Sequence, residues 1–325
     1  MGLLATGDPG VEQAGEQEPA CRHDLDDLRR QCVRHPDDQV AMERLAAALV
    51  GAVAQASRER DRACRDGLLK ELNGLCLRHP CNAAVLECLA PALAEAVGQA
   101  TRAGDLADRD ILLGGLRRLY ARHPGDAAVR RQLAAALAGS AREARGDLES
   151  ATHDALIDEL RTLYDEHPGD AAVRESLAAA LLNAIERDAH ERHPALGSAL
   201  LEELRRLYDE HPGDAAVRVH LAMALAGAVH HAHREGHPAW RDTRLKELHG
   251  LRVEHPEDTA VRERLATALY TVIVHTHHEQ DRASRDALLG DLRRLSADHP
   301  DDPKVRERLT MALFNLPTLG PAQKG

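Results

Sequence analysis

Apolar residues recur along the chain in two alternating stripes, each with the spacing of one face of an α-helix. Residues 200–225 show both stripes in succession. The first stripe consists of Leu200, Leu201, Leu204 and Leu207. The second stripe consists of Leu221, Ala224 and Leu225. This pattern predicts two consecutive amphipathic helices, each of which buries one face.

A His-Pro pair separates the two predicted helices and recurs seven times through the chain. The copies are His35-Pro36, His79-Pro80, His123-Pro124, His167-Pro168, His211-Pro212, His255-Pro256 and His299-Pro300. Successive copies are 44 residues apart, without insertion or deletion. Proline ends the first helix because it disfavours the helical conformation in the residue before it. The aspartate that follows, such as Asp214, is expected to start the second helix as its N-cap, and Asn82 takes this place in the second repeat.

A fixed period of this length is the signature of stacked repeats. One repeat offers about six large apolar side chains, each contributing roughly 1.5–3 kcal/mol when buried. Ordering its residues costs on the order of 1.5 kcal/mol per residue, so neighbouring repeats must cover one another. We expect an all-α protein with about seven helix-pair repeats of 44 residues. They span residues 23–316, between a disordered N-terminal tail (1–22) and a C-terminal tail (317–325).

The second helix of each pair resembles a motif of the tetratricopeptide repeat family. Leu177-Ala178-Ala179-Ala180-Leu181 is similar to the first-helix signature of that family, and Pro168 and Pro212 occupy the place of its terminal proline. The resemblance covers roughly residues 24–316. It implies a right-handed superhelix in which an extended peptide or a partner helix lies in a concave groove lined by the first helices.

Three features depart from that family. The period is 44 residues instead of 34, and the extra ten residues fall between the two helices of the family motif. Arginine replaces the large aromatic residue of the first helix at Arg174, Arg218 and Arg262. Leucine replaces the small residue that opens the second helix, as at Leu200 and Leu288. A HEAT-like helical solenoid is the alternative fold.

Composition and charge narrow the class of protein. The net charge of −11 disfavours nonspecific binding of nucleic acid, which requires a basic face. The N-terminal residues lack the basic and apolar regions of a signal peptide, and no later run looks long enough to span a membrane. We therefore expect a cytoplasmic protein without membrane contact. Only four of the 42 basic residues are lysine, a skew typical of a GC-rich bacterial genome.

Motifs that would indicate an enzyme are missing from the sequence. It contains no Gly-rich phosphate loop, no His-Glu-x-x-His motif and no nucleophile elbow, so we expect neither catalysis nor a cofactor. All six cysteines lie before residue 89 and none has Cys-x-x-Cys spacing, which favours free cytosolic thiols over a zinc site. Cys32 and Cys76 occupy the place of the later Tyr120, Tyr164 and Tyr208, which indicates a role in helix packing.

Histidines form two groups with different expected roles. Those of the His-Pro pairs end helices, where an imidazole can meet free carbonyl groups and the negative end of the helix dipole. A second group, which also includes His230 and His278, contains the candidate metal ligands His231, His233, His275 and His277. His231 and His275 are one period apart, as are His233 and His277, so packed helices could bring them together. A metal site would need three or four ligands, and a solvent-exposed polar helix end is the alternative.

A column of arginines is the strongest candidate for binding. It consists of Arg130, Arg174, Arg218, Arg262 and Arg306, one in each of the last five repeats. Met42 and Leu86 hold this place in the first two. The column suits a ladder that binds an anion or an acidic peptide, because a guanidinium holds a carboxylate with two hydrogen bonds. The alternative is ion pairing with the acid before the His-Pro pair of the same repeat. These acids are Glu166, Glu210, Glu254 and Asp298.

These features together predict a non-catalytic scaffold that binds a peptide or partner protein, one that is acidic if the arginine column binds it. Two other functions stay open: a metal- or pH-responsive module built on the second histidine group, and a regulatory subunit of an enzyme on another chain. At the C-terminal end, Leu309, Leu313 and Phe314 are expected to expose an apolar face. Either residues 316–319 fold over this face, or two chains associate through it.

Overall fold

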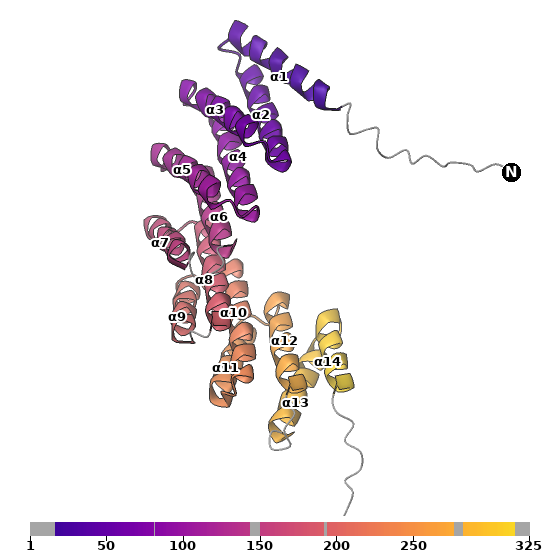
Figure 1. The fold of residues 1–325 in the computed structure, drawn as a ribbon. Helices are drawn as coiled ribbons and strands as arrows, with labels where there is room; N and C mark the ends of the chain where they lie inside the picture. The colour runs from indigo at the N-terminus through magenta and orange to yellow at the C-terminus, as the bar shows by residue number, and fades with distance from the viewer. Residues whose placement is uncertain (1–16, 81, 144–149, 192–193, 276–281, 316–325) are drawn as a thin grey trace, which may run out of the picture. The chain divides into compact units, whose positions relative to one another are not determined.

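The computed structural model describes residues 17–80, 82–143, 150–191, 194–275 and 282–315. These residues form fourteen α-helices and contain no strand, so the all-α prediction is confirmed (Figure 1). Seven helices precede the His-Pro pairs: α1 (Gln17–Arg34), α3 (Arg62–Arg78), α5 (Leu106–Arg122), α7 (Ser150–Glu166), α9 (Pro194–Glu210), α11 (Pro238–Glu254) and α13 (Arg282–Asp298). Seven follow them: α2 (Gln39–Glu59), α4 (Ala83–Arg102), α6 (Ala127–Glu143), α8 (Ala171–Glu191), α10 (Ala215–Arg234), α12 (Thr259–His275) and α14 (Pro303–Asn315).

The His-Pro pair begins a tight turn with the same hydrogen bond in every repeat. The histidine carbonyl accepts the N–H of the residue three positions later, as in Asp214 N to His211 O at 2.9 Å. Proline fits the second position of such a β-turn because its ring fixes φ at the required value. Asp214 then caps α10, since its Oδ1 accepts the N–H groups of Ala216 and Val217 at 3.1 and 3.3 Å. The predicted helix stop and N-cap are both confirmed.

The connections at the other end of the helix pairs are less uniform. Gly104 and Gly236 adopt φ values of 71° and 73°, a left-handed conformation that glycine adopts without strain. Asp61 and Asp105 follow such turns and cap α3 and α5 with their side chains. The odd-numbered helices are 17 or 18 residues long, and the even-numbered helices are 13 to 21 residues long.

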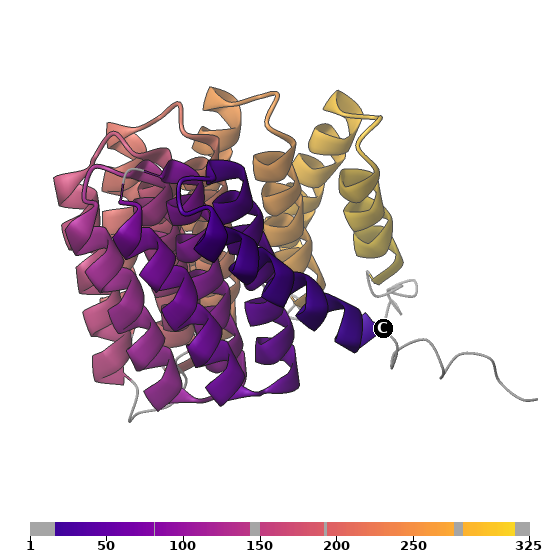
Figure 2. The same cartoon turned by 90° about the horizontal axis from the view of Figure 1, so that it is seen from above.

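The chain divides into two compact units, residues 1–173 and 174–325. In the first unit, α2, α4 and α6 pack side by side, and α3 and α5 each contact the even-numbered helices before and after them (Figure 1). In the second unit, α10, α12 and α14 pack side by side, and α11 and α13 fill the equivalent places. Figure 2 shows successive helices joined by connections at their two ends.

Leucine and alanine form the core of each unit, as the stripes predicted. Leu204 is 0% exposed and Leu221 is 4% exposed. The alanines at the place of Ala224 are buried in the second to seventh repeats, which lets the even-numbered helices approach closely. The chain has few aromatic residues, and these small and branched side chains supply most of the packing.

Two findings bear on expectations about the N-terminal half. The first helix begins at Gln17, so it includes residues 17–22, which the sequence pattern had assigned to a tail.

By length and composition alone, α2 and α4 are apolar enough to cross a membrane. The expectation that no run is long enough was therefore too strict. This is weak evidence for a membrane, because 39% and 50% of their most apolar windows are buried in the protein, as in the core helices of soluble proteins.

Candidate functional site

Four arginines of the predicted column donate Nε to an aspartate 40 residues later. The Nε–Oδ2 distances are 2.6 Å for Arg130–Asp170, 2.9 Å for Arg174–Asp214, 2.7 Å for Arg218–Asp258 and 2.9 Å for Arg262–Asp302. Each of these aspartates is the N-cap of the next even-numbered helix. We call this series the arginine–cap ladder.

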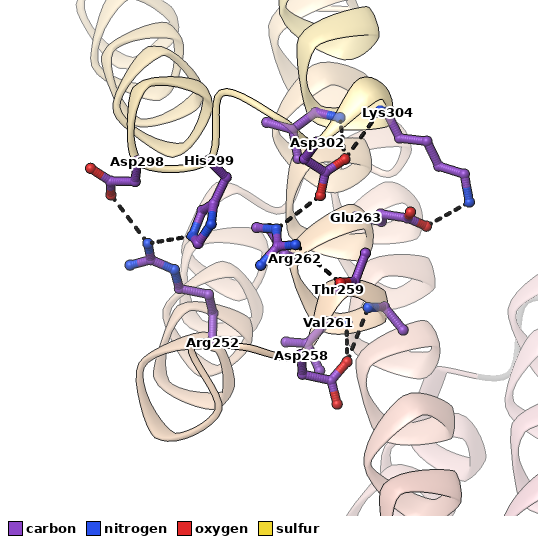
Figure 3. A network of polar contacts seen from close by, with 12 residues as sticks. Arg252, Asp258, Thr259, Val261, Arg262, Glu263, Asp298, His299, Asp302 and Lys304 are labelled. Carbon is purple, nitrogen blue, oxygen red and sulfur yellow. Dashed lines mark hydrogen bonds and ion pairs between the residues drawn. The ribbon is translucent and has the colours of Figure 1, made fainter.

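The junction between the sixth and seventh repeats shows how one aspartate serves both purposes (Figure 3). Oδ1 of Asp302 accepts the N–H groups of Lys304 and Val305 at 3.1 and 3.2 Å, whereas Oδ2 accepts Nε of Arg262. Arg262 also donates to the carbonyl of Pro256 at 3.3 Å and to Oγ1 of Thr259 at 3.1 Å. The guanidinium therefore ties its own turn to the cap of the next repeat.

The sequence predicted the right kind of contact but the wrong partner. As the alternative to ligand binding, it paired the arginines of the fourth to seventh repeats with the acid before the His-Pro pair of the same repeat, such as Glu254 for Arg262. The structure instead pairs it with the cap of the next repeat, because stacked helices bring residues about one period apart into contact. The four paired arginine side chains are only 10–13% exposed. This geometry favours the ion-pair alternative, and ligand binding by the column remains a prediction.

Arg306, the fifth arginine of the column, differs from the other four. It lies on α14 and is exposed. Within the part of the chain that the structure describes, no carboxylate pairs with it. Among the described residues, the ladder thus ends in a guanidinium without a carboxylate partner.

The arginines keep the cap carboxylates ionised. Burial alone would raise the pKa of Asp258, but the hydrogen bond from Arg218 and those from the backbone N–H groups of Val261 and Ala260 lower it below its ordinary value. The pKa values of Asp170 and Asp302 are lowered by the same balance of burial and hydrogen bonds. An ionised cap holds both the helix N-terminus and the arginine more strongly than a neutral one.

A second series of contacts joins a tyrosine to the acid and the histidine at the end of the next odd-numbered helix. The Tyr208 hydroxyl donates to Oε2 of Glu254 at 3.0 Å and lies 2.7 Å from Nε2 of His255. Tyr120 repeats these contacts with Glu166 and His167 at 2.9 and 2.8 Å. A hydroxyl has one proton, so we infer that the histidine Nε2 carries a proton and donates to the tyrosine oxygen.

These contacts change the role assigned to the His-Pro histidines. Capping is performed by the backbone: His255 N–H donates to the carbonyl of Leu251 at 3.1 Å. The imidazole of His255 instead joins its repeat to the tyrosine of the preceding one. Burial, followed by the hydrogen bond to Glu254 and the charge of that carboxylate, raises the pKa of Tyr208 to about 12.

The tyrosine ties were missed in the sequence, although a signal for them exists. Tyr120 and Tyr208 are each followed 46 residues later by a glutamate. Cys32 and Cys76, at the same place in the first two repeats, are followed at this distance by arginine. Arg252 is followed by Asp298, to which it donates at 3.1 Å. The residue type at the tyrosine position and the residue type 46 positions later thus change together from repeat to repeat.

A third series links successive odd-numbered helices on their exposed side. Arg29 donates through Nη2 to Glu71 at 2.7 Å, and Arg117 does the same to Glu159 at 2.7 Å. Arg205 pairs with Glu247 in the second unit. Each pair spans 42 residues. Exposed pairs contribute little stability individually, so this series chiefly fixes the register of the helices.

The second histidine group does not converge as the sequence suggested. His275 lies 6.4 and 6.3 Å, between ring centroids, from His230 and His233. His231 is buried and its ring faces Trp240 at 5.9 Å, so it does not meet His275. His277 lies outside the described residues. Among the residues that are described, no three His, Cys, Asp or Glu side chains are arranged to hold a metal ion.

A pocket of about 340 Å³ opens at the junction drawn in Figure 3. It is lined by Thr259, Arg262, Glu263 and residues 298–303. Most of its charged groups already have partners in the protein: Asp298 pairs with Arg252, Glu263 pairs with Lys304 at 2.7 Å, and Arg262 pairs with Asp302. The pocket therefore contains little unused capacity for a charged ligand.

One position of the even-numbered helices varies in residue type and is at least partly exposed to solvent in every repeat. It precedes the invariant leucine of each of these helices and is exposed or half-buried in every repeat. Its occupants are Arg44, Cys88, Gln132, Ser176, His220, Arg264 and Arg308. The residue type at this position changes along the chain, whereas the leucine beside it is invariant, and we call the position the variable stripe.

Comparisons with known proteins do not narrow the assignment. No protein-family model matches the chain, and a search of curated proteins finds no match either. The geometry of the repeats is therefore the basis for proposing a function.

Proposed function

We propose that the chain is a non-catalytic scaffold for protein–protein interaction. Its helix pairs would stack into a right-handed solenoid similar to an expanded tetratricopeptide array. The side-by-side packing of even-numbered helices within each unit supports this arrangement. So do the identical His-Pro turns of all seven repeats. Such solenoids offer long surfaces on which an extended peptide or a partner helix can lie.

One observation carries this proposal: the third to seventh repeats are joined by the same arginine–cap contact, whereas a partly exposed position changes in residue type along the chain. The four arginines of the arginine–cap ladder hold neighbouring repeats together. The variable stripe carries seven side chains that such a frame would present in fixed order. A constant frame with a changing surface suits recognition of another protein, because ordered side chains lose little entropy on binding.

Two members of the variable stripe indicate the charge of the partner. Arg264 is exposed, and Arg308 lies over the ring of Tyr270, with 5.5 Å from its guanidinium carbon to the ring centroid. In the described chain, neither has a carboxylate partner. Both are available to hold acidic side chains of a ligand, which agrees with the acidic partner suggested by the sequence.

Selection from a displayed library of random peptides on the immobilised full-length chain tests the proposal. We expect enriched peptides that contain Asp or Glu, with binding that weakens as salt rises. The double variant Arg264→Ala, Arg308→Ala should weaken binding at least tenfold while leaving the helix signal in circular dichroism intact. A library that yields no specific peptide would refute the scaffold proposal.

Arg218→Ala separates the variable stripe from the arginine–cap ladder. It should lower the free energy of unfolding by about 1.5–3 kcal/mol, because a charge-assisted hydrogen bond is lost and Asp258 remains half-buried. Its affinity for the selected peptides should not change. The control Arg131→Ala removes an exposed arginine with no ion pair in the described structure and should alter neither quantity. Weaker binding by Arg218→Ala, with unchanged stability, would instead assign binding to the arginine column.

A further inference from the structure

The last described helix carries a face that its equivalent in the previous repeat uses for contact. In α12 this face consists of Arg262, Ala266, Leu269 and Tyr270. One period later, in α14, it consists of Arg306, Thr310, Leu313 and Phe314. Leu269 is 0% exposed in α12, which packs against α14, whereas Leu313 is 44% and Phe314 is 87% exposed. The predicted exposure of Leu313 and Phe314 is confirmed, while Leu309 is half-buried.

The first described repeat carries the complementary half of the same contact. Ala48 and Ala52 on α2 are half-buried. Their equivalents on α4, Ala92 and Ala96, are 3% and 0% exposed. Both α2 and α4 pack against the even-numbered helix that follows, but of the two only α4 also packs against a preceding one, so we infer that α2 covers Ala92 and Ala96. The face of α2 around Ala48 and Ala52 thus matches a surface that later repeats bury against the preceding repeat.

Two specific pairs at the junction of the sixth and seventh repeats give the register of this contact. Arg262 binds the cap Asp302, and Arg308 lies over the ring of Tyr270. The equivalents of Arg262 and Tyr270 in α14 are Arg306, which lacks a carboxylate partner in the described chain, and the exposed Phe314. Both therefore lack the partners that their equivalents in α12 have.

The first repeat supplies both missing partners. The equivalent of Asp302 is Asp38, which caps α2 and accepts from Ala41 N at 3.0 Å and from Gln31 at 3.2 Å. No arginine among the described residues reaches it. The equivalent of Arg308 is Arg44, which is exposed and has no ion pair in the described structure.

We propose that a second copy of the chain supplies the next repeat, so that α2 of one protomer packs on α14 of its partner. Arg306 then binds the partner's Asp38, and Phe314 lies under the partner's Arg44. The contact buries the apolar side chains of Leu313 and Phe314 against the small side chains of Ala48 and Ala52. This inference concerns self-assembly; it shares Arg44 with the variable stripe but does not depend on the proposed function.

The contact is heterologous, because the two surfaces that meet are different. Each protomer that joins through one of its two faces leaves its other face unoccupied. Such a contact continues along a chain of protomers unless the geometry closes it into a ring. Assemblies should therefore grow past the dimer as protein concentration rises, and high salt should weaken them by screening the Arg306–Asp38 pair.

Sedimentation velocity over a range of concentrations tests the proposal on the full-length chain. The wild-type mass should increase with concentration beyond that of a dimer. The double variant Arg306→Glu, Phe314→Ala removes one face, and Ala52→Glu removes the other. Each should remain a monomer when alone, with a helix signal equal to that of the wild type. An equimolar mixture still contains one intact face of each kind and should form a heterodimer that grows no further.

Arg131→Glu serves as the control, because it reverses the charge of an exposed arginine on α6 away from both faces. It should assemble as the wild type does. Three results would overturn the proposal: a wild-type chain that is monomeric at all concentrations, growth that the face variants do not change, or wild-type growth that stops at a dimer. The last would indicate symmetric pairing of two identical faces.

Discussion

At the scale of single residues, the cap aspartates divide their two oxygens between two partners. Asp302 uses Oδ1 for the helix N-terminus and Oδ2 for an arginine of the preceding repeat. The junction between the first and second repeats shows what happens without the arginine. Met42 holds the arginine position there, and the next cap is Asn82, which still accepts Val85 N at 3.2 Å. An amide is therefore sufficient to cap the helix, and where an arginine is present the charge of the aspartate adds the contact between repeats.

The tyrosine ties predict a specific dependence on alkaline pH. The pKa of Tyr208 is raised to about 12, above the ordinary value of about 10, so its contribution to stability is complete below pH 10 and is lost as pH rises through 12. Tyr208→Phe should lower the free energy of unfolding by about 0.5–1.5 kcal/mol at neutral pH. Titration of tyrosinate absorbance should lose its component near pH 12 in this variant. A wild-type titration complete by pH 11 would contradict the raised pKa.

At the scale of helices, the unit of stability is the pair together with the neighbours that cover it. Leu221 is 4% exposed on α10, and Leu221→Ala should cost about 2–5 kcal/mol through lost burial and a cavity. Because α10 contacts α9, α11 and α12, exchange of backbone hydrogens should speed up chiefly in these helices. Hydrogen-exchange mass spectrometry measures this. Equal acceleration in α2 and α4 would show that the chain unfolds as one cooperative block.

Much of the element-scale structure was predictable from the sequence. Leucine spacing, the His-Pro stop and the aspartate cap each depend on residues within a few positions of one another, as Leu204 and Asp214 illustrate. The partner of Arg218 was not predictable by that reasoning, since Asp258 is 40 residues away and becomes a neighbour only when helices stack. The candidate surface was harder still to predict. The sequence pattern favoured the arginine column as the binding surface, whereas the burial of these arginines favours the variable stripe.

At the scale of the molecule, three consecutive repeats should be enough to fold. Residues 194–315 contain the complete pairs α9–α10, α11–α12 and α13–α14, and every packing contact found between these helices joins near neighbours. We expect this fragment to show a helical signal and a cooperative thermal transition. Its matched control, residues 215–315, lacks α9, which covers α10, and should melt at a lower temperature. An unfolded 194–315 fragment would contradict this modular behaviour.

The His-Pro turn has a consequence for how such a gene can change in length. The arginine–cap and tyrosine ties all attach within a few residues of this turn, so an extra residue there would displace donors from acceptors in both neighbouring repeats. Gain or loss of a full 44-residue cassette leaves every donor opposite an equivalent acceptor. Recombination between copies is thus the one kind of length change that this end of the repeat readily accepts. Small insertions are better tolerated in the connections at the opposite end, such as the turn at Gly236.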